Sequence, residues 1–194
     1  MPYAPEHKQQ TRQRILLAAG KLFRSYGFHG VSINQVMAEA GLTRGGFYAH
    51  FKSKVALFTE VVGADYGLAL KMRQAREGEL RDTEGRQYRP AEALDYYLSP
   101  ENREEIAQDC TLLSLTPDVR RVGAPANLAY DQNIAALMDE FSANGLSPDA
   151  AAQATALAVG SATLASAMND EQQAAQILSA ANARIQALLI EASS

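Results

Sequence analysis

The stretch Ser32–Phe51, SINQVMAEAGLTRGGFYAHF, predicts two short helices joined by a tight turn. Ser32 and Gln35 match the capping box that starts a helix, and Gly41 is typical of the position just past a helix end. Apolar residues follow the i, i+3, i+4, i+7 spacing of one helix face: Ile33, Val36, Met37 and Ala40. Two such helices form a helix-turn-helix. The pattern fits a DNA-binding element, and it equally fits a helical hairpin that only completes a small core.

The second predicted helix carries side chains suited to nucleic acid on one face. Phe47 and Phe51 are four residues apart and can share the inward side. That arrangement leaves Arg44 and Tyr48, also four apart, together on another face. A guanidinium and a phenol one turn apart can reach phosphate oxygens or base edges in a DNA groove. Two glycines lie between them, and each costs a helix about 1 kcal/mol relative to alanine. Close approach of the backbone to a partner would explain them.

Hydroxyl and basic groups flank this helix on both sides. Thr43 can cap it, and Ser53 can cap the following helix, whose free amide groups could meet a phosphate. No second His or Cys lies at ligand spacing from His50, so a hydrogen bond is expected there and no metal. The predicted DNA contacts are Ser32, Gln35, Thr43, Arg44, Gly45, Gly46, Tyr48, His50, Lys52 and Lys54.

Several spaced residues in and after the stretch match a known pattern: Ala-Gly-Leu-Thr at 40–43, Gly45, Phe-Tyr-Ala-His-Phe at 47–51 and Ser53-Lys54. With the preceding helix, they make residues 11–62 resemble the DNA-binding domain of the TetR family of bacterial transcriptional regulators. The resemblance implies that the helix starting near Thr43 enters the major groove and that Tyr48 and Lys54 contact phosphates. Gly46 departs from the commoner pattern, which has a small hydroxyl or methyl residue there and with it a possible base contact.

Charge is distributed unevenly along the 194 residues, whose net charge is −4. Residues 1–62 hold eight Lys/Arg against three acidic residues, giving +5, and the remaining residues carry −9. This asymmetry predicts a basic nucleic-acid-binding end on an acidic body. The sequence has no apolar run long enough for a membrane span and no apolar segment of a secretory signal near its N-terminus. Because a single cysteine also fits a reducing compartment, a cytoplasmic protein is expected.

Apolar periodicity predicts an all-α fold with two domains. A helix over residues 8–26 completes a three-helix DNA-binding domain of residues 8–62, with the helix-turn-helix at 32–51. A single helix from 53 to about 76 is expected to connect it to a helical ligand-binding and dimerisation domain of residues 63–194. The charged segment 77–89 is predicted to be an exposed loop or frayed helix end. Further helices are expected over 90–98, 118–143, 148–168 and 170–192.

The last two predicted helices combine many alanines with a leucine-bearing stripe. They fit a pair buried within one domain, and they fit a four-helix dimer face with two helices from each chain. In the TetR family this pair is the usual dimer surface, and a homodimer would present two recognition helices to a pseudo-palindromic DNA operator. The predicted dimer residues are Leu157, Ser161, Leu164, Met168, Ile177, Ala181, Ile185 and Leu188.

Apolar and amphipathic side chains in the middle of the chain could line a pocket or simply form core: Tyr66, Tyr96, Tyr97, Cys110, Leu113, Tyr130, Met138 and Phe141. The TetR resemblance implies a small-molecule effector in this domain that changes the separation of the recognition helices, and hence a ligand-released repressor. Cys110 is the one candidate for sensing electrophiles or redox state, although an isolated cysteine is more often an inert small hydrophobe.

Enzymatic signals are lacking in the sequence. It has no Gly-rich phosphate loop, no metal-ligand cluster and only three histidines, so neither enzymatic activity nor a cofactor is expected. A helical adaptor that binds protein through its hairpin is the remaining alternative, and a salt-dependent affinity for DNA would separate the two.

Overall fold

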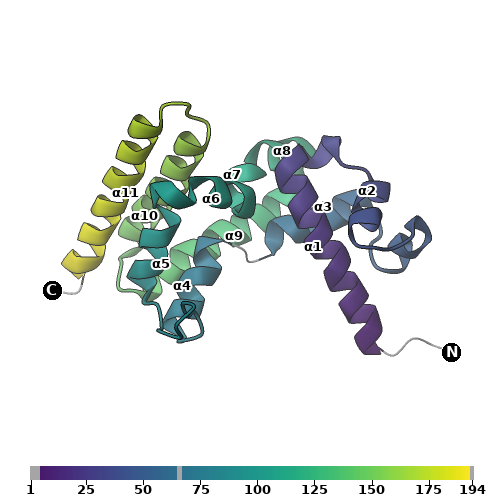
Figure 1. The fold of residues 1–194 in the computed structure, drawn as a ribbon, viewed down its shortest axis with the longest axis horizontal. Coiled ribbons are helices and arrows are strands. Elements are labelled where there is room, and N and C mark those ends of the chain that lie inside the picture. The colour runs from purple at the N-terminus through teal and green to yellow at the C-terminus, as the bar shows by residue number, and fades with distance from the viewer. Residues whose placement is uncertain (1–4, 65–66, 193–194) are drawn as a thin grey trace. The chain divides into compact units, whose positions relative to one another are not determined.

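The computed structural model of the chain describes residues 5–64 and 67–192 (Figure 1). Over these ranges the regular secondary structure is helical, and one isolated β-bridge pairs Arg81 with Gln87. The predicted all-α fold class is therefore confirmed. The chain divides into two compact units, one made of Met1–Ala64 and Ser114–Tyr130, the other of Asp65–Leu113 and Asp131–Ser194.

The first unit joins the N-terminal helices to a segment from later in the chain. Its elements are α1 (Pro5–Gly30), α2 (Ile33–Glu39), the 3-10 helix η1 (Arg44–Ala49), α3 (Lys54–Gly63), α8 (Thr116–Val122) and the first turns of α9 (Ala124–Ala143). One apolar core contains Phe23, Phe47 and Phe58 together with Leu115 and Val119. The sequence assigned all of residues 63–194 to the second domain, whereas residues 114–130 pack with the first unit.

Local capping sets the boundaries of the helix-turn-helix. The Gln35 N–H donates to Ser32 Oγ at 3.3 Å, and the Ser32 N–H donates to Gln35 Oε1 at 2.8 Å, so the predicted capping box is present. Thr43 is the N-cap residue of η1, but its hydroxyl makes no capping hydrogen bond, and that predicted cap is wrong. The second helix is a 3-10 helix of 6 residues. This form is common in short helices, and two adjacent glycines disfavour a longer α-helix.

The single helix expected from residue 53 to about 76 is interrupted, so this prediction is wrong. α3 ends at Gly63, Ala64 has extended backbone angles, and α4 (Leu68–Arg76) begins after Gly67. Gly67 has a φ of 90°, a conformation that side-chain-bearing residues rarely adopt. Apolar residues continue on both sides of the break, so their periodicity did not reveal it. Tyr66, a predicted pocket residue, lies outside the described residues.

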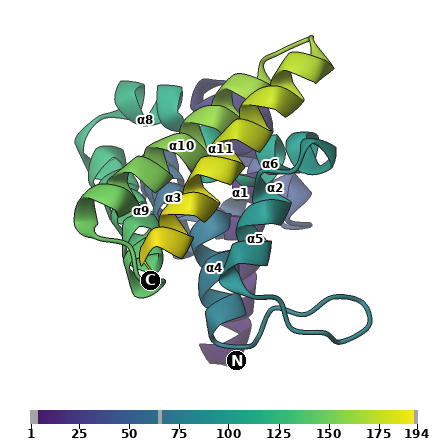
Figure 2. The ribbon, with the colours of Figure 1, turned by 90° about the vertical axis from the view of Figure 1, so that its left-hand side faces the viewer.

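The second unit is built from the remaining helices: α4, α5 (Pro90–Tyr97), η2 (Pro100–Asn102), α6 (Arg103–Asp109), most of α7 (Thr111–Ser114), the rest of α9, α10 (Pro148–Ser166) and α11 (Glu171–Ala192). α10 and α11 lie side by side (Figures 1 and 2). The predicted starts of both helices are confirmed. Pro148 is in the first turn of α10, and Asp170 Oδ1 accepts a hydrogen bond from the Gln173 N–H at 3.0 Å before α11.

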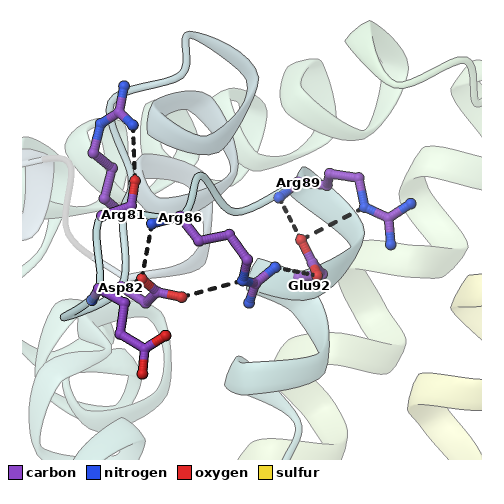
Figure 3. Close-up of polar contacts among 7 residues, drawn as sticks. Arg81, Asp82, Arg86, Arg89 and Glu92 are labelled. Carbon is purple, nitrogen blue, oxygen red and sulfur yellow. Dashed lines mark hydrogen bonds and ion pairs between the residues drawn. The ribbon is translucent and has the colours of Figure 1, made fainter.

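The charged connection between α4 and α5 is an ordered hairpin-like loop (Figure 3). Its backbone pairs the Asp82 N–H with the Arg86 carbonyl and the Tyr88 N–H with the Leu80 carbonyl. Arg86 joins the loop to the start of α5, because it donates to Asp82 Oδ2 at 3.1 Å and to Glu92 Oε1 at 2.8 Å. The predicted loop is therefore confirmed, and its charged side chains bond one another and the start of α5.

Candidate nucleic-acid interface

η1 buries one aromatic side chain and exposes two polar ones. Phe47 is fully buried, and its ring stacks on that of Phe51 with centroids 5.9 Å apart. Tyr48 remains 62% exposed, with its ring edge-on to Phe47, and Arg44 is also exposed. The Arg44 guanidinium and the Tyr48 phenol are therefore exposed on a short helix whose orientation is fixed by its own buried Phe47.

The two glycines of η1 leave its outer surface bare. A Cβ atom added to Gly45 would meet nothing within 4 Å, and one added to Gly46 would make only an ordinary contact with Met37 Cε at 3.7 Å. Neither glycine has a positive φ. Neither the space around these two positions nor their φ angles therefore require glycine, and η1 would leave room for the backbone of a partner.

The predicted contacts on either side of η1 differ in their freedom to bind. Ser32 and Gln35 are exposed, but their side chains bond each other at the start of α2. The exposed Thr43 hydroxyl makes no capping bond, so it is available at the rim of η1.

His50 is the C-cap residue of η1 and is half-buried. Burial lowers the pKa of its imidazole, and the positive charges of Lys8 and Arg12 lower it further. Its Nδ1 is buried and has no hydrogen-bond partner among the residues that the structure describes. These neighbours mark a locally positive region, where an anion such as a phosphate would be stabilised.

The start of α3 supplies the basic side of the interface. Ser53 Oγ accepts a hydrogen bond from the Ala56 N–H at 3.0 Å, which confirms the predicted cap. Lys52 is exposed, and the Lys54 Nζ lies 4.3 Å from the centroid of the Phe28 ring. Burial lowers the pKa of Lys54, and the negative charge of Asp118 opposes that shift.

Sequence patterns did not identify three side chains that support this region. Arg12 lies over the Phe51 ring at 4.6 Å and is paired with Glu60. The Phe28 ring contacts the Lys54 ammonium, and Asp118 accepts a hydrogen bond from the Phe28 N–H. The Phe28–Asp118 contact spans 90 residues of sequence, which no local pattern can reveal.

The predicted pocket residues lie in different environments. Tyr97, Cys110 and Phe141 are buried in the second unit, and the Tyr97 hydroxyl donates to Cys110 Sγ at 3.1 Å. Tyr96, Leu113 and Met138 are half-buried there, whereas Tyr130 belongs to the first unit. Two surface hollows of about 580 and 450 Å³ are lined by other residues. The pocket therefore stays a prediction.

The predicted dimer residues are split between the interior and the surface of α10 and α11. Ser161, Ala181, Ile185 and Leu188 are buried within the single chain. Leu157, Met168 and Ile177 are half-buried, and Leu164 is 59% exposed. A partner could therefore contact Leu164 directly, and Ile190, at 68% exposure, is a further exposed apolar side chain on α11.

The residues that the structure describes contain neither a candidate metal site nor a candidate membrane span. Within residues 5–64 and 67–192, no group of three or more His, Cys, Asp or Glu side chains is placed to hold a metal ion. None of the helices in these ranges is long and apolar enough to cross a membrane.

Over the described residues the chain is helical, and the buried Phe47 holds η1 in place. Arg44 and Tyr48 are exposed on η1, and Lys52 and Lys54 follow it. These features are typical of the helix-turn-helix class of regulatory protein. Residues 15–61 match the model of the tetR family of bacterial regulatory proteins. By sequence, the similarity to this family covers the N-terminal segment, and the fold of most of the chain resembles that of a solved TetR-family regulator.

Relatives that are similar in sequence match only a part of the chain. The transcriptional regulator AcrR of Shigella flexneri is 43% identical over 56 residues, which cover 29% of this chain and 26% of AcrR. The transcriptional repressor BepR of Brucella suis is 37% identical over 54 residues, 28% of this chain and 26% of BepR. The chain thus aligns with only about a quarter of the length of these relatives.

Solved structures resemble the chain over nearly its whole length. A TetR-family regulator from Cytophaga hutchinsonii has a TM-score of 0.70 at 17% identity, covering 94% of this chain and 96% of that one. Reduced NemR of Escherichia coli has a TM-score of 0.67 at 18% identity, covering 92% and 96%. At these identities the likeness concerns the fold.

Proposed function

We propose that the protein is a transcriptional regulator that binds a pseudo-palindromic DNA operator as a homodimer and is released by a small-molecule effector. The observation that carries the proposal is the face of η1, on which Arg44 and Tyr48 are exposed while Phe47 is fully buried. Such a face suits the major groove, where Arg reads base edges and Tyr contacts the backbone. Lys52 and Lys54 supply further positive charge beside it.

A dimer follows from the small size of this interface. One helix of 6 residues makes too few contacts for a specific, tight complex. Two copies related by a two-fold axis would read two half-sites about one helical turn, or a multiple of it, apart. The exposed side chains of α10 and α11 are the proposed contact between the copies.

Selection of bound duplexes from a random DNA pool, followed by salt titration of the selected sequences, tests the proposal. An inverted repeat bound with steep salt dependence is the expected result. No enrichment, with only weak salt-sensitive binding, would reject an operator-binding function and favour a helical protein-interaction adaptor.

Point variants assign the roles of the interface residues. Tyr48→Ala and Lys54→Ala should weaken binding to all sequences and reduce the salt slope, because phosphate contacts carry no base information. Arg44→Ala should instead relax preference at one base position. Tyr26→Ala is a matched control, since Tyr26 is 67% exposed outside the proposed interface. Unchanged base preference in Arg44→Ala would remove Arg44 from base readout.

Sensing of electrophiles through Cys110 is a second candidate for the release signal. Cys110 is the one cysteine in the chain, and its Sγ accepts a hydrogen bond from the Tyr97 hydroxyl. Alkylation would break this buried contact and add volume to a packed core, which costs stability in that unit. A thiol-reactive alkylating agent should release DNA from the wild type and leave the Cys110→Ser complex intact. Equal release from both proteins would exclude this role.

A further inference from the structure

Asp118 on α8 is bonded to the point where α1 changes direction. Gly27 has φ 70° and ψ 169°, which interrupts the helical backbone of α1. The next amide, that of Phe28, donates to Asp118 Oδ2 at 3.0 Å. A Cβ atom on Gly27 would lie 2.8 Å from the same oxygen. The kink of α1 and the carboxylate of α8 therefore fit each other closely.

Phe28 in turn lies directly beneath a proposed DNA contact. The Lys54 Nζ is 4.3 Å from the centroid of the Phe28 ring, a distance at which the ring face attracts an ammonium group. The Phe28 ring is fixed on its other sides by edge contacts with Phe58 and His29, at centroid distances of 5.0 and 5.1 Å. The Lys54 ammonium thus lies on the ring of the residue whose amide Asp118 binds.

The Asp118 carboxylate is largely removed from solvent. Asp118 is 8% exposed, and its ion-pair partner Arg121 lies 3.6 Å away with a side chain that is largely in solvent. Burying a carboxylate costs free energy unless it is well bonded. The Phe28 amide is its closest bonding partner on α1, so the main effect of Asp118 on the neighbouring helix is to hold this backbone.

We propose that Asp118 is a positioning residue for DNA binding: by holding the Phe28 amide, it places the Phe28 ring under Lys54 and thereby orients the Lys54 ammonium toward a DNA phosphate. The inference rests on the proposed function, since Lys54 is a DNA contact only if the chain binds DNA. It adds a residue outside the helix-turn-helix, on a segment that the first unit receives from later in the sequence.

Substitutions at Asp118 separate its hydrogen bond from its charge. Asp118→Ala removes the acceptor and should weaken binding to all DNA sequences by about tenfold, the value of one charge-assisted contact, with a salt slope lower by about 1. Asp118→Asn keeps an amide oxygen for Phe28 and removes a negative charge near the phosphate. It should therefore bind as tightly as the wild type or more tightly. Tighter binding by both variants would mean that Asp118 acts only by repulsion and would overturn the proposal.

Combination with Lys54→Gln tests whether Asp118 acts through Lys54. In that background, Asp118→Ala should cause no further loss of affinity and no further change of salt slope. Full additivity of the two substitutions would overturn the proposal. The folded fraction of each variant, measured by circular dichroism at the binding temperature, corrects for any general loss of stability.

A measurement without DNA keeps this inference distinct from the proposed function. In the wild type, the Phe28 ring current should shift the NMR signals of the Lys54 ε-methylene protons upfield. The shift should persist in Asp118→Asn and shrink in Asp118→Ala. An unchanged shift in Asp118→Ala would refute positioning even if DNA binds. If Asp118→Ala lost the shift but the wild-type protein bound no DNA, the positioning of Lys54 by Asp118 would stand and the DNA-binding function would be rejected.

Discussion

At the scale of single residues, a substitution at Gly45 should affect stability and DNA binding in opposite directions. Space around it is open, and its backbone angles suit other residues. Gly45→Ala should therefore raise the free energy of unfolding by about 0.4–1 kcal/mol, because alanine restricts the unfolded chain. The same methyl group should weaken DNA binding by holding η1 away from the groove. Urea unfolding and DNA titration measure the two effects, and equal DNA affinity would contradict close backbone approach.

His50 provides a second prediction at this scale, through pH. Burial, followed by the charges of Lys8 and Arg12, lowers the pKa of His50 in the folded protein below its usual 6.5. As pH falls through 6.5, the unfolded chain then takes up a proton at this residue more readily than the folded one. The free energy of unfolding should fall over this window and level off below the folded pKa. His50→Gln should reduce that slope, as seen in urea unfolding between pH 7.5 and 5; an unchanged slope would exclude His50 as its source.

At the scale of elements, the sequence predicted what short-range chemistry decides. Ser32, Ser53 and Asp170 do cap their helices, because a cap and its amide partner lie three residues apart. The break before Gly67 was missed because apolar residues continue on both sides of it, and Thr43 was assigned a cap bond that its hydroxyl does not make. The burial of Phe47 and Phe51 and the exposure of Arg44 and Tyr48 could be predicted, because residues four apart share a face of a helix.

The loop between α4 and α5 gives a prediction about a single element. Its ordering depends on Arg86, whose bonds to Glu92 and Asp82 raise its own pKa. Arg86→Gln should speed amide hydrogen exchange in residues 79–89, because both ion pairs are lost. The free energy of global unfolding should change little, since exposed ion pairs contribute little. Arg81→Gln is the comparison variant, because Arg81 donates to the Gly85 carbonyl within the loop and takes part in neither of these ion pairs. Exchange in Arg86→Gln equal to that in the wild type would mean that Arg86 does not order the loop.

At the scale of the whole molecule, the composition of the first unit could not be predicted. Residues 114–130 enter its core through Leu115 and Val119, but in the sequence they follow Cys110 and its apolar neighbours without any boundary signal. Long-range packing in one core with Phe23 and Phe58 places this segment in the first unit. Asp118 lies in the same segment and bonds the Phe28 amide. Sequence patterns therefore missed the buried contacts that support this surface, whereas local spacing predicted the exposure of Arg44 and Tyr48.

Homodimer formation is the prediction that concerns the whole molecule. Leu164 on α10 is 59% exposed, and burial of such a side chain in a dimer would be worth about 1.5–3 kcal/mol. Leu164→Glu should therefore shift the protein toward monomer in sedimentation-velocity experiments and lower operator affinity, because a monomer engages one half-site. Leu128→Glu is the matched control, since Leu128 is 61% exposed but belongs to the first unit. If both variants sediment as the wild type does, the contact between copies does not include Leu164, and the dimer must form through another surface or not at all.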